Sequence, residues 1–108
     1  MMEWDKKQFA QDIYAIVRLI PPGRVTSYGA IAKALSQARQ SRMVGHVMNS
    51  SPKDVPAHRV VNSSGVLTGR AFFGGDRMAM LLREEGVLVK DNKVQKFKTF
   101  FWDPLLEL

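Results

Sequence analysis

The chain has 108 residues, of which 45% are hydrophobic, a length and composition that suit one domain with a single modest core. Sixteen Lys and Arg residues against ten Asp and Glu give a formal net charge of +6, which favours an anionic partner, nucleic acid rather than a membrane. The absence of cysteine excludes thiol nucleophiles, disulfides and thiolate metal sites.

The remaining features of the composition argue against a metal, a cofactor and a membrane anchor. His46 and His58 lie apart in the sequence, so we expect no zinc cluster, no metal and no cofactor. No apolar run approaches the roughly 20 residues of a membrane-spanning helix, and the N-terminal segment is polar. We therefore expect a cytoplasmic protein with no membrane contact.

An amphipathic helix is expected near the N-terminus. Apolar residues recur at helical spacing from Phe9 to Ile20, with polar side chains between them, which is typical of a helix that packs one face on a core. Pro21, Pro22 and Gly23 then end the helix, because proline lacks an amide proton and glycine permits a tight turn.

The next segment predicts a helix-turn-helix. Thr26 or Ser27 can cap a helix over residues 28–38, and Ser41 can cap a second helix over residues 42–50. A helix, a short turn and another helix make up this motif.

The second half of the chain mixes strand and helix signals. Residues 55–61 have the β-branched content of a strand, and a turn at 62–65 lets residues 66–67 return as its partner in a hairpin or wing. The glycines of residues 68–75 predict a mobile loop.

A fourth helix and an aromatic tail follow. Asp76 is the expected cap of a helix that runs through Glu85 and ends at Gly86. Residues 90–108 predict either a last strand packed on the core, which we favour, or a frayed end. Without a repeat or a low-complexity linker, we expect residues 1–108 to form a single domain.

Four motifs occur in a fixed order: residues 22–32 (PGRVTSYGAIA), 42–49 (RMVGHVMN), 56–65 (PAHRVVNSSG) and 82–86 (LREEG). Together they resemble the DNA-binding domain of the O6-alkylguanine-DNA alkyltransferases, over residues 20–89. One such motif would be weak evidence, whereas the ordered set is specific. The resemblance implies an α+β, mainly α fold: a winged helix-turn-helix domain like the C-terminal domain of those enzymes.

The third motif departs from the family at its reactive residue. The alkyltransferases have Pro-Cys-His-Arg-Val, whose cysteine accepts the alkyl group, but this chain has Ala57 at that place. An alanine methyl group cannot act as a nucleophile, so we predict that the chain is not an enzyme. It resembles the alkyltransferase-like, non-transferring branch, and His58, Arg59 and Glu85 are interpreted as a retained buried polar network without a catalytic task.

The resemblance also implies a function and a DNA-binding surface. Members bind O6-alkylguanine in duplex DNA with a helix in the minor groove and turn the nucleotide out of the stack; the non-transferring branch then flags the lesion for nucleotide excision repair proteins. Arg42 matches the intercalating arginine, and Tyr28 matches the tyrosine that turns the 3′ phosphate. Gly45 gives either a slim helix face or close helix packing. The further DNA-binding candidates are Arg24, Thr26 and Ser27, and other phosphate contacts are expected from Lys33, Arg39 and Lys53.

A pocket for the extruded base is expected beside the third motif. Its candidate lining residues are Ala57, Val60, Ser63, Ser64, Arg70 and Met48. Arg70 matches an arginine that lies against the flipped base, or it contacts a phosphate; Met48 lies beneath the base or only fills the core. Because a methyl group replaces a thiol, the pocket floor is expected to accept larger alkyl groups.

Three other hypotheses about function use the same residues. His58 could act as a general base on water in an enzyme, the domain could be a sequence-specific winged-helix regulator, or the chain could be a Cys-to-Ala variant of a true methylated-DNA-protein-cysteine methyltransferase. We favour a monomeric damage sensor, because lesion recognition needs the pocket but no nucleophile.

Overall fold

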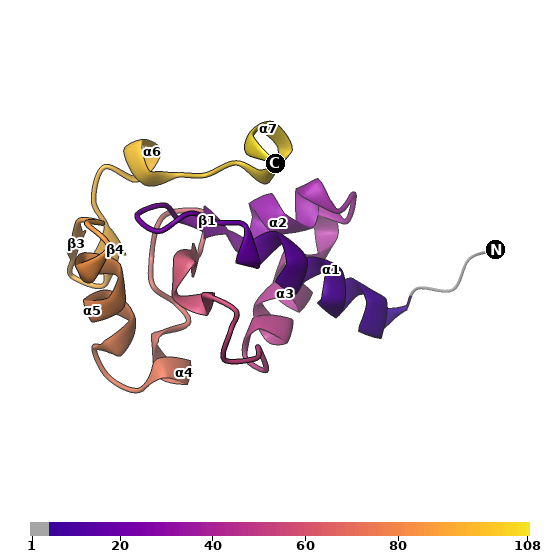
Figure 1. Ribbon diagram of the computed structural model, residues 1–108, viewed down its shortest axis with the longest axis horizontal. Coiled ribbons are helices and arrows are strands. Elements are labelled where there is room, and N and C mark those ends of the chain that lie inside the picture. The colour runs from indigo at the N-terminus through magenta and orange to yellow at the C-terminus, as the bar shows by residue number, and fades with distance from the viewer. Residues whose placement is uncertain (1–4) are drawn as a thin grey trace.

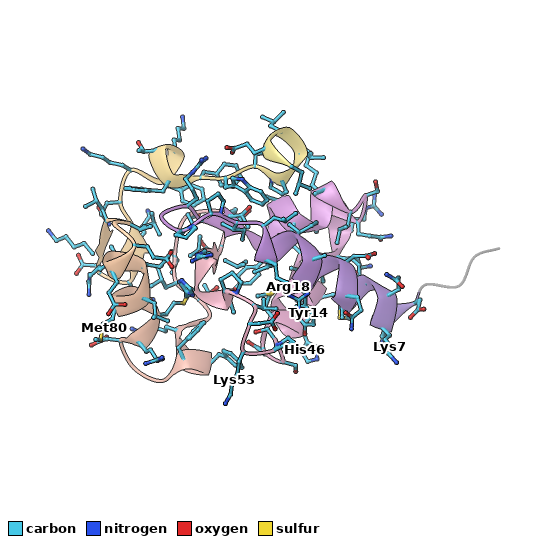
Figure 2. The ribbon with its side chains drawn as sticks, viewed as in Figure 1. Lys7, Tyr14, Arg18, His46, Lys53 and Met80 are labelled. Carbon is cyan, nitrogen blue, oxygen red and sulfur yellow. The ribbon has the colours of Figure 1, made fainter. Side chains whose placement is uncertain are left out.

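The computed structural model of the protein describes residues 5–108 (Figure 1). As expected, helix α1 (Lys6–Arg18) packs one apolar face on the core. Asp5 caps the helix by accepting hydrogen bonds from the amides of Lys7 and Gln8. Tyr14 reaches from α1 to the helix-turn-helix, where its hydroxyl donates to the carbonyl of Val47 at 2.9 Å (Figure 2). The buried face of α1 comprises Phe9, Ile13, Tyr14, Ile16 and Val17.

The predicted helix-turn-helix is present, with shorter elements than expected. It consists of β1 (Thr26–Ser27), α2 (Tyr28–Ala34), a 3-10 turn η1 (Ala38–Gln40) and α3 (Ser41–Met48). Ser27 caps α2 by accepting a hydrogen bond from the amide of Ala30 at 3.0 Å, which confirms one of the two predicted caps. The predicted extension of α2 to residue 38 is wrong, because the chain turns at Ser36, whose φ is +60°.

Ser41 does not cap α3. Ser41 is the first residue of the helix, and the preceding Gln40 makes no capping hydrogen bond with its side chain. The predicted cap at this position is therefore wrong.

The predicted strand over residues 55–61 is correct only at its end. Residues Ala57–Arg59 form a 3-10 turn, η2, and only Val60–Val61 form a strand, β2. This strand pairs in parallel with β1, in the register Thr26 to Val60 and Ser27 to Val61. The pairing fixes the third motif against the start of the helix-turn-helix.

The predicted hairpin between residues 55–61 and 66–67 is wrong. The Asn62 side chain accepts hydrogen bonds from the amides of Ser64 and Val66, at 2.9 and 2.8 Å, and these bonds close a tight turn. Val66 then makes an antiparallel bridge to Lys93 rather than to β2. The antiparallel hairpin of the fold lies downstream, between β3 (Val89–Lys90) and β4 (Lys93–Val94).

The segment predicted as a mobile loop contains a short helix, α4 (Arg70–Phe73). Gly74 and Gly75 follow it with φ values of +76° and +61°, a conformation that favours glycine, and lead into α5 (Arg77–Glu84). Asp76 precedes α5 without a capping hydrogen bond from its side chain, so that predicted cap is wrong. The predicted end of this helix before Gly86 is confirmed.

The aromatic tail packs on the core, as favoured, but mostly as turns and two short helices rather than as a strand. It contains α6 (Phe97–Phe100) and α7 (Pro104–Glu107), and it runs along the top of the view in Figure 1, above β1 and α2. Trp102 is 3% exposed, and its amide donates to the carbonyl of Val25 at 2.7 Å. Arg24 fastens the same segment by donating to the carbonyls of Phe100 and Phe101, at 3.2 and 2.6 Å.

Two apolar clusters meet at β2, because successive residues of a strand point to opposite faces. Val60 belongs to the larger cluster, with α1, α2, α3 and Trp102, whereas Val61 belongs to the smaller one, with Leu67, α5 and the β3–β4 hairpin. Of the helices within residues 5–108, none combines the length and apolar character needed to cross a bilayer.

Replacing Trp102 tests whether the tail is an integral part of the core. Trp102→Ala removes a large buried side chain and should lower the free energy of unfolding by about 3–5 kcal/mol in urea titrations. Leu106→Ala is the control, because Leu106 is 81% exposed and its loss should change stability by no more than about 0.5 kcal/mol. Equal stability of the two variants would show that the tail does not hold the domain together.

Candidate nucleic-acid interface and base pocket

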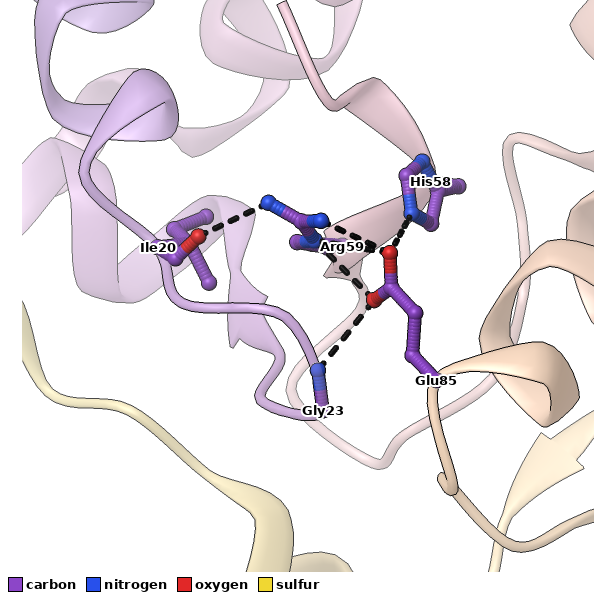
Figure 3. A network of polar contacts seen from close by, with 5 residues as sticks. All are labelled: Ile20, Gly23, His58, Arg59 and Glu85. Carbon is purple, nitrogen blue, oxygen red and sulfur yellow. Dashed lines mark hydrogen bonds and ion pairs between the residues drawn. The ribbon is translucent and has the colours of Figure 1, made fainter.

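The carboxylate of Glu85 joins three segments that lie far apart in the sequence (Figure 3). Arg59 donates to it through Nε at 3.0 Å and Nη2 at 2.7 Å, and His58 Nε2 donates at 2.8 Å. The amide of Gly23 donates at 3.2 Å to Oε1, the oxygen that also accepts from Arg59 Nε, whereas His58 and Arg59 Nη2 bond to Oε2. Arg59 also donates from Nη1 to the carbonyl of Ile20 at 2.9 Å, so the whole predicted network is present.

The network holds Glu85 in its charged form. Burial alone raises the pKa of this carboxyl group, but the hydrogen bonds from Arg59, His58 and the Gly23 amide outweigh it and lower the pKa from 4.5 to about 2. The side chains of His58 and Glu85 are only 12% and 16% exposed. The imidazole is therefore oriented by a permanent negative charge, the arrangement that a general base requires, yet the adjacent position 57 offers no group to deprotonate.

Ala57 lies at the wall of a small cavity. The same cavity is lined by Tyr28, Met48, Gly69 and Phe73, together with Asn49 and Phe72. Its volume of about 10 Å³ is enough for roughly one water molecule. A purine base does not fit unless the surrounding side chains move, and α4 with its two aromatic residues forms one of the walls.

Tyr28 stands between this cavity and an open groove. The groove has a volume of about 690 Å³ and is lined by Tyr28, Arg42, Ser63 and Thr68, with Gly29, Ser41 and Asn62. Tyr28 therefore lines both spaces, which places it where a base passing from the groove to the cavity would meet it. Sequence reasoning found Tyr28 and Arg42 but gave no role to Thr68.

One glycine leaves room for the Tyr28 side chain. A methyl group at Gly69 would lie only 3.1 Å from the Tyr28 hydroxyl oxygen, whereas one at Gly45 would lie 3.7 Å from the ring. Because 3.7 Å is an ordinary van der Waals distance, this contact does not require glycine at position 45, and the two predicted roles of Gly45 both stay predictions. Sequence reasoning missed Gly69, and only its place directly before Arg70 could have drawn attention to it.

Arg42 and its neighbours form an exposed basic surface at the start of α3. A second hollow, of about 660 Å³, is lined by Arg39, Arg42, Met43 and His46, with Gln40 and Ser41. Within residues 5–108, neither arginine takes part in an ion pair. Both guanidinium groups are therefore free of protein carboxylates that would compete with a phosphate.

Three predicted DNA-binding residues have side chains that are buried or bonded within the protein, and their part in DNA binding stays a prediction. Thr26 is fully buried in β1, and Ser27 is 5% exposed and caps α2. Arg24 points to the C-terminal tail, where its guanidinium also pairs with Glu107 at 3.0 Å. Ser27 therefore acts at the start of α2, next to Tyr28, whereas the side chain of Arg24 contacts the tail and is still 32% exposed.

The predicted pocket residues fall into separate places. Met48 and Ala57 line the cavity, and Val60 is buried in the core behind them. Ser63 lines the open groove, whereas Ser64 is an exposed residue of the adjoining turn. Arg70 begins α4 with its side chain exposed and outside the cavity lining, so the structure does not bring it to Ala57.

No group of three or more His, Asp or Glu residues within residues 5–108 is placed to hold a metal ion.

Comparison with known proteins gives this surface a family context. Residues 8–87 match the family described as 6-O-methylguanine DNA methyltransferase, DNA binding domain. The chain is 33% identical to alkyltransferase-like protein 1 of Schizosaccharomyces pombe, over 90% of this chain and 96% of that one. It is 35% identical to the DNA base-flipping protein of Escherichia coli, over 88% of this chain and 74% of that one.

A solved structure agrees with these relatives. The fold superimposes on the S. pombe alkyltransferase-like protein in complex with damaged DNA containing O6-carboxymethylguanine, with a TM-score of 0.80 and 30% identity. The match covers 94% of this chain and 98% of that chain. Against curated methylated-DNA–protein-cysteine methyltransferases, the chain spans about half of the relative's length, 48%.

The Glu85 network should make stability depend on pH in acid. A carboxyl group whose pKa falls on folding stabilises the protein above its unfolded-state value of 4.5 and loses that effect as the pH drops towards 2. Glu85→Gln should therefore lose about 3 kcal/mol of unfolding free energy at pH 6, and its stability should vary less than wild type between pH 5 and 2.

Urea unfolding at several pH values measures both effects. Glu84→Gln is the matched control, because Glu84 is the exposed neighbour on α5 and should leave the wild-type pH profile unchanged. Parallel pH profiles for wild type and Glu85→Gln would contradict the assigned network.

Proposed function

The chain belongs to the family of the 6-O-methylguanine DNA methyltransferase DNA-binding domain, and from this premise we propose that it recognises O6-alkylguanine in duplex DNA without removing the alkyl group. It binds the duplex through the helix-turn-helix, extrudes the modified nucleotide and retains it. In this proposal the protein is a damage sensor and not an enzyme.

The observation that carries the proposal is the pairing of an intact polar network with an inert residue. His58 is held by Glu85 at 2.8 Å, yet its neighbour Ala57 lines the cavity with a methyl group. The sequence has no cysteine that could reach this place from elsewhere. The chain therefore keeps the framework of the alkyl-accepting site and lacks the atom that forms the new bond.

In our proposal, Arg42 and Tyr28 of the groove have separate tasks in base extrusion. Turning a nucleotide out of the duplex costs a few kcal/mol of stacking and pairing, so a side chain must fill the gap that it leaves. Arg42 is exposed at the start of α3 and performs this task in our proposal. Tyr28 meets the turned backbone at the boundary between groove and cavity.

The cavity must open before it can hold a base. Its volume of about 10 Å³ is far below that of a purine, and Phe73 of α4 forms part of its wall. Gly74 and Gly75 adjoin α4, and a methyl group added at either glycine would meet no atom within 4 Å, so the space around them is open. We assign the opening movement to α4, which carries Arg70 towards the extruded base when it moves.

We also propose that other proteins remove the lesion after this protein has bound it. A sensor that leaves the alkyl group in place protects DNA only if another activity removes the lesion, so we assign the next step to nucleotide excision repair proteins. The bound complex, with an extruded and covered nucleotide, is the signal that those proteins recognise.

Binding to matched duplexes tests the proposal. Wild-type protein should bind a duplex with one O6-methylguanine more tightly than the same duplex with guanine, and Arg42→Ala should reduce this preference on the order of tenfold, because the gap in the stack is no longer filled. Fluorescence anisotropy titrations give both affinities. Arg77→Ala, which removes an exposed arginine of α5, is the control and should keep the preference. Equal wild-type affinity for the two duplexes would refute lesion recognition.

Filling the cavity tests where the base is held. Ala57→Met adds a flexible apolar side chain to the cavity wall and should weaken lesion binding by about 1–3 kcal/mol, the usual cost of overpacking. Binding to undamaged DNA should stay unchanged, since the groove is untouched. Titrations with O6-methyl and O6-benzyl adducts should show the larger loss for the larger group. An unchanged lesion preference would place the base outside this cavity.

A further inference from the structure

The β3–β4 hairpin and α6 carry a cluster of exposed lysines that the proposed lesion site does not use. Lys90 and Lys93 lie directly opposite each other in the antiparallel register. Like charges in this position repel and destabilise a two-stranded ladder. Lys96 and Lys98 follow within the next five residues and are also exposed. We call these four residues the lysine hairpin.

Backbone and side-chain hydrogen bonds set the register of the two paired lysines. The tip residues Asp91 and Asn92 have φ values of +53° and +61°, which is typical of a tight two-residue hairpin turn. The Gln95 side-chain amide donates to the carbonyls of Lys90 and Lys93, at 3.2 and 3.1 Å, and braces both strands. The backbone of the hairpin therefore keeps Lys90 and Lys93 opposite each other.

Ion pairs within residues 5–108 do not neutralise this charge. Four lysines and one aspartate between residues 90 and 98 contribute +3 of the formal net charge of +6. Among the described residues, 5–108, no ion pair includes any of the four lysines. Lys96 also has a left-handed φ of +52°, which is uncommon for a residue with a long side chain. Two local preferences are thus broken in one short segment, a pattern expected where a surface serves binding.

We propose that the lysine hairpin binds the phosphate backbone of duplex DNA outside the lesion site. A polyanion relieves the repulsion between Lys90 and Lys93, and DNA offers the regular spacing of phosphates that several lysines can contact together. The inference rests on the proposed function only in taking duplex DNA as the partner. It adds a contact that does not depend on damage or on sequence.

The position of the hairpin connects it to the groove of Tyr28 and Arg42. Its backbone is hydrogen-bonded to the turn at residues 62–67: Asn92 accepts from the Leu67 amide at 2.9 Å, and the Val94 amide donates to Gly65 at 2.8 Å. Asn62 and Ser63 of the same turn line the groove. The lysine hairpin is thus the next element beyond one wall of the groove, and a duplex seated there continues towards it.

Removing the paired charges gives a direct test. Lys90→Gln/Lys93→Gln should weaken binding to lesion and undamaged duplexes by the same factor, on the order of tenfold at physiological salt. The slope of log K against log salt should become shallower by about 1.8, the loss of two phosphate contacts. The ratio between lesion and control affinity should not change, because the variant leaves Tyr28 and Arg42 intact.

Controls separate this effect from misfolding and from a general loss of charge. Lys6→Gln/Lys7→Gln removes two exposed lysines at the far end of the molecule, near the Lys7 label in Figure 2, and should keep the wild-type salt slope. Thermal unfolding should show the Lys90→Gln/Lys93→Gln protein at least as stable as wild type, since it has lost a repulsion. If that variant fails to fold, Lys96→Gln/Lys98→Gln tests the same surface.

The outcomes distinguish this inference from the proposed function. If the Lys90→Gln/Lys93→Gln variant folds and keeps the wild-type affinity and salt slope, the inference is overturned, even if wild type prefers lesion DNA. That result would indicate that the lysines bind another anionic partner, such as an acidic protein. Loss of affinity confined to the lesion duplex would also overturn it. A wild type that binds both duplexes equally refutes lesion recognition and leaves the salt-slope test of the hairpin intact.

Discussion

The carboxylate of Glu85 is the interaction on which the geometry of the site depends. Arg59, His58 and the Gly23 amide all donate to it, so one side chain ties the end of α5 to η2 and to the turn after α1. A partly buried carboxylate is costly without such donors, and a guanidinium group is equally costly without its acceptor. Each partner therefore stabilises the others, and together they fix the position of Ala57 at the cavity wall.

This dependence explains how a site can keep its form after losing its chemistry. The family resemblance implies that the matching histidine and glutamate prepare a thiol for attack in the alkyltransferases, whereas in this structure their hydrogen bonds hold the site together. The second role does not need the cysteine. In our proposal, binding an extruded base and reacting with it are separable properties of one framework, and this chain keeps the residues for binding. The hydrogen bonds that Glu85 accepts do not involve the side chain of residue 57, so they are present with alanine at that position.

The sequence predicted those features that depend on local signals or on a specific motif. The apolar face of α1, the Ser27 cap and the end of α5 before Gly86 follow from nearby residues, and the His58–Glu85 contact followed from the family resemblance. Pairing partners far apart in the sequence were not predictable in the same way. Val66 pairs with Lys93 and not with the adjacent strand, and Arg24 binds carbonyl groups at Phe100 and Phe101. Both contacts are set by how the tail packs, which no short pattern encodes.

We propose that the protein holds an alkylated base and leaves it chemically unchanged. Intact mass measurement of both the polypeptide and the lesion strand, after a saturated complex has been formed and then dissociated, tests this claim most directly. We predict that both masses equal those of the untreated molecules. A lesion strand lighter by its alkyl group, with or without a matching gain on the polypeptide, would contradict the account.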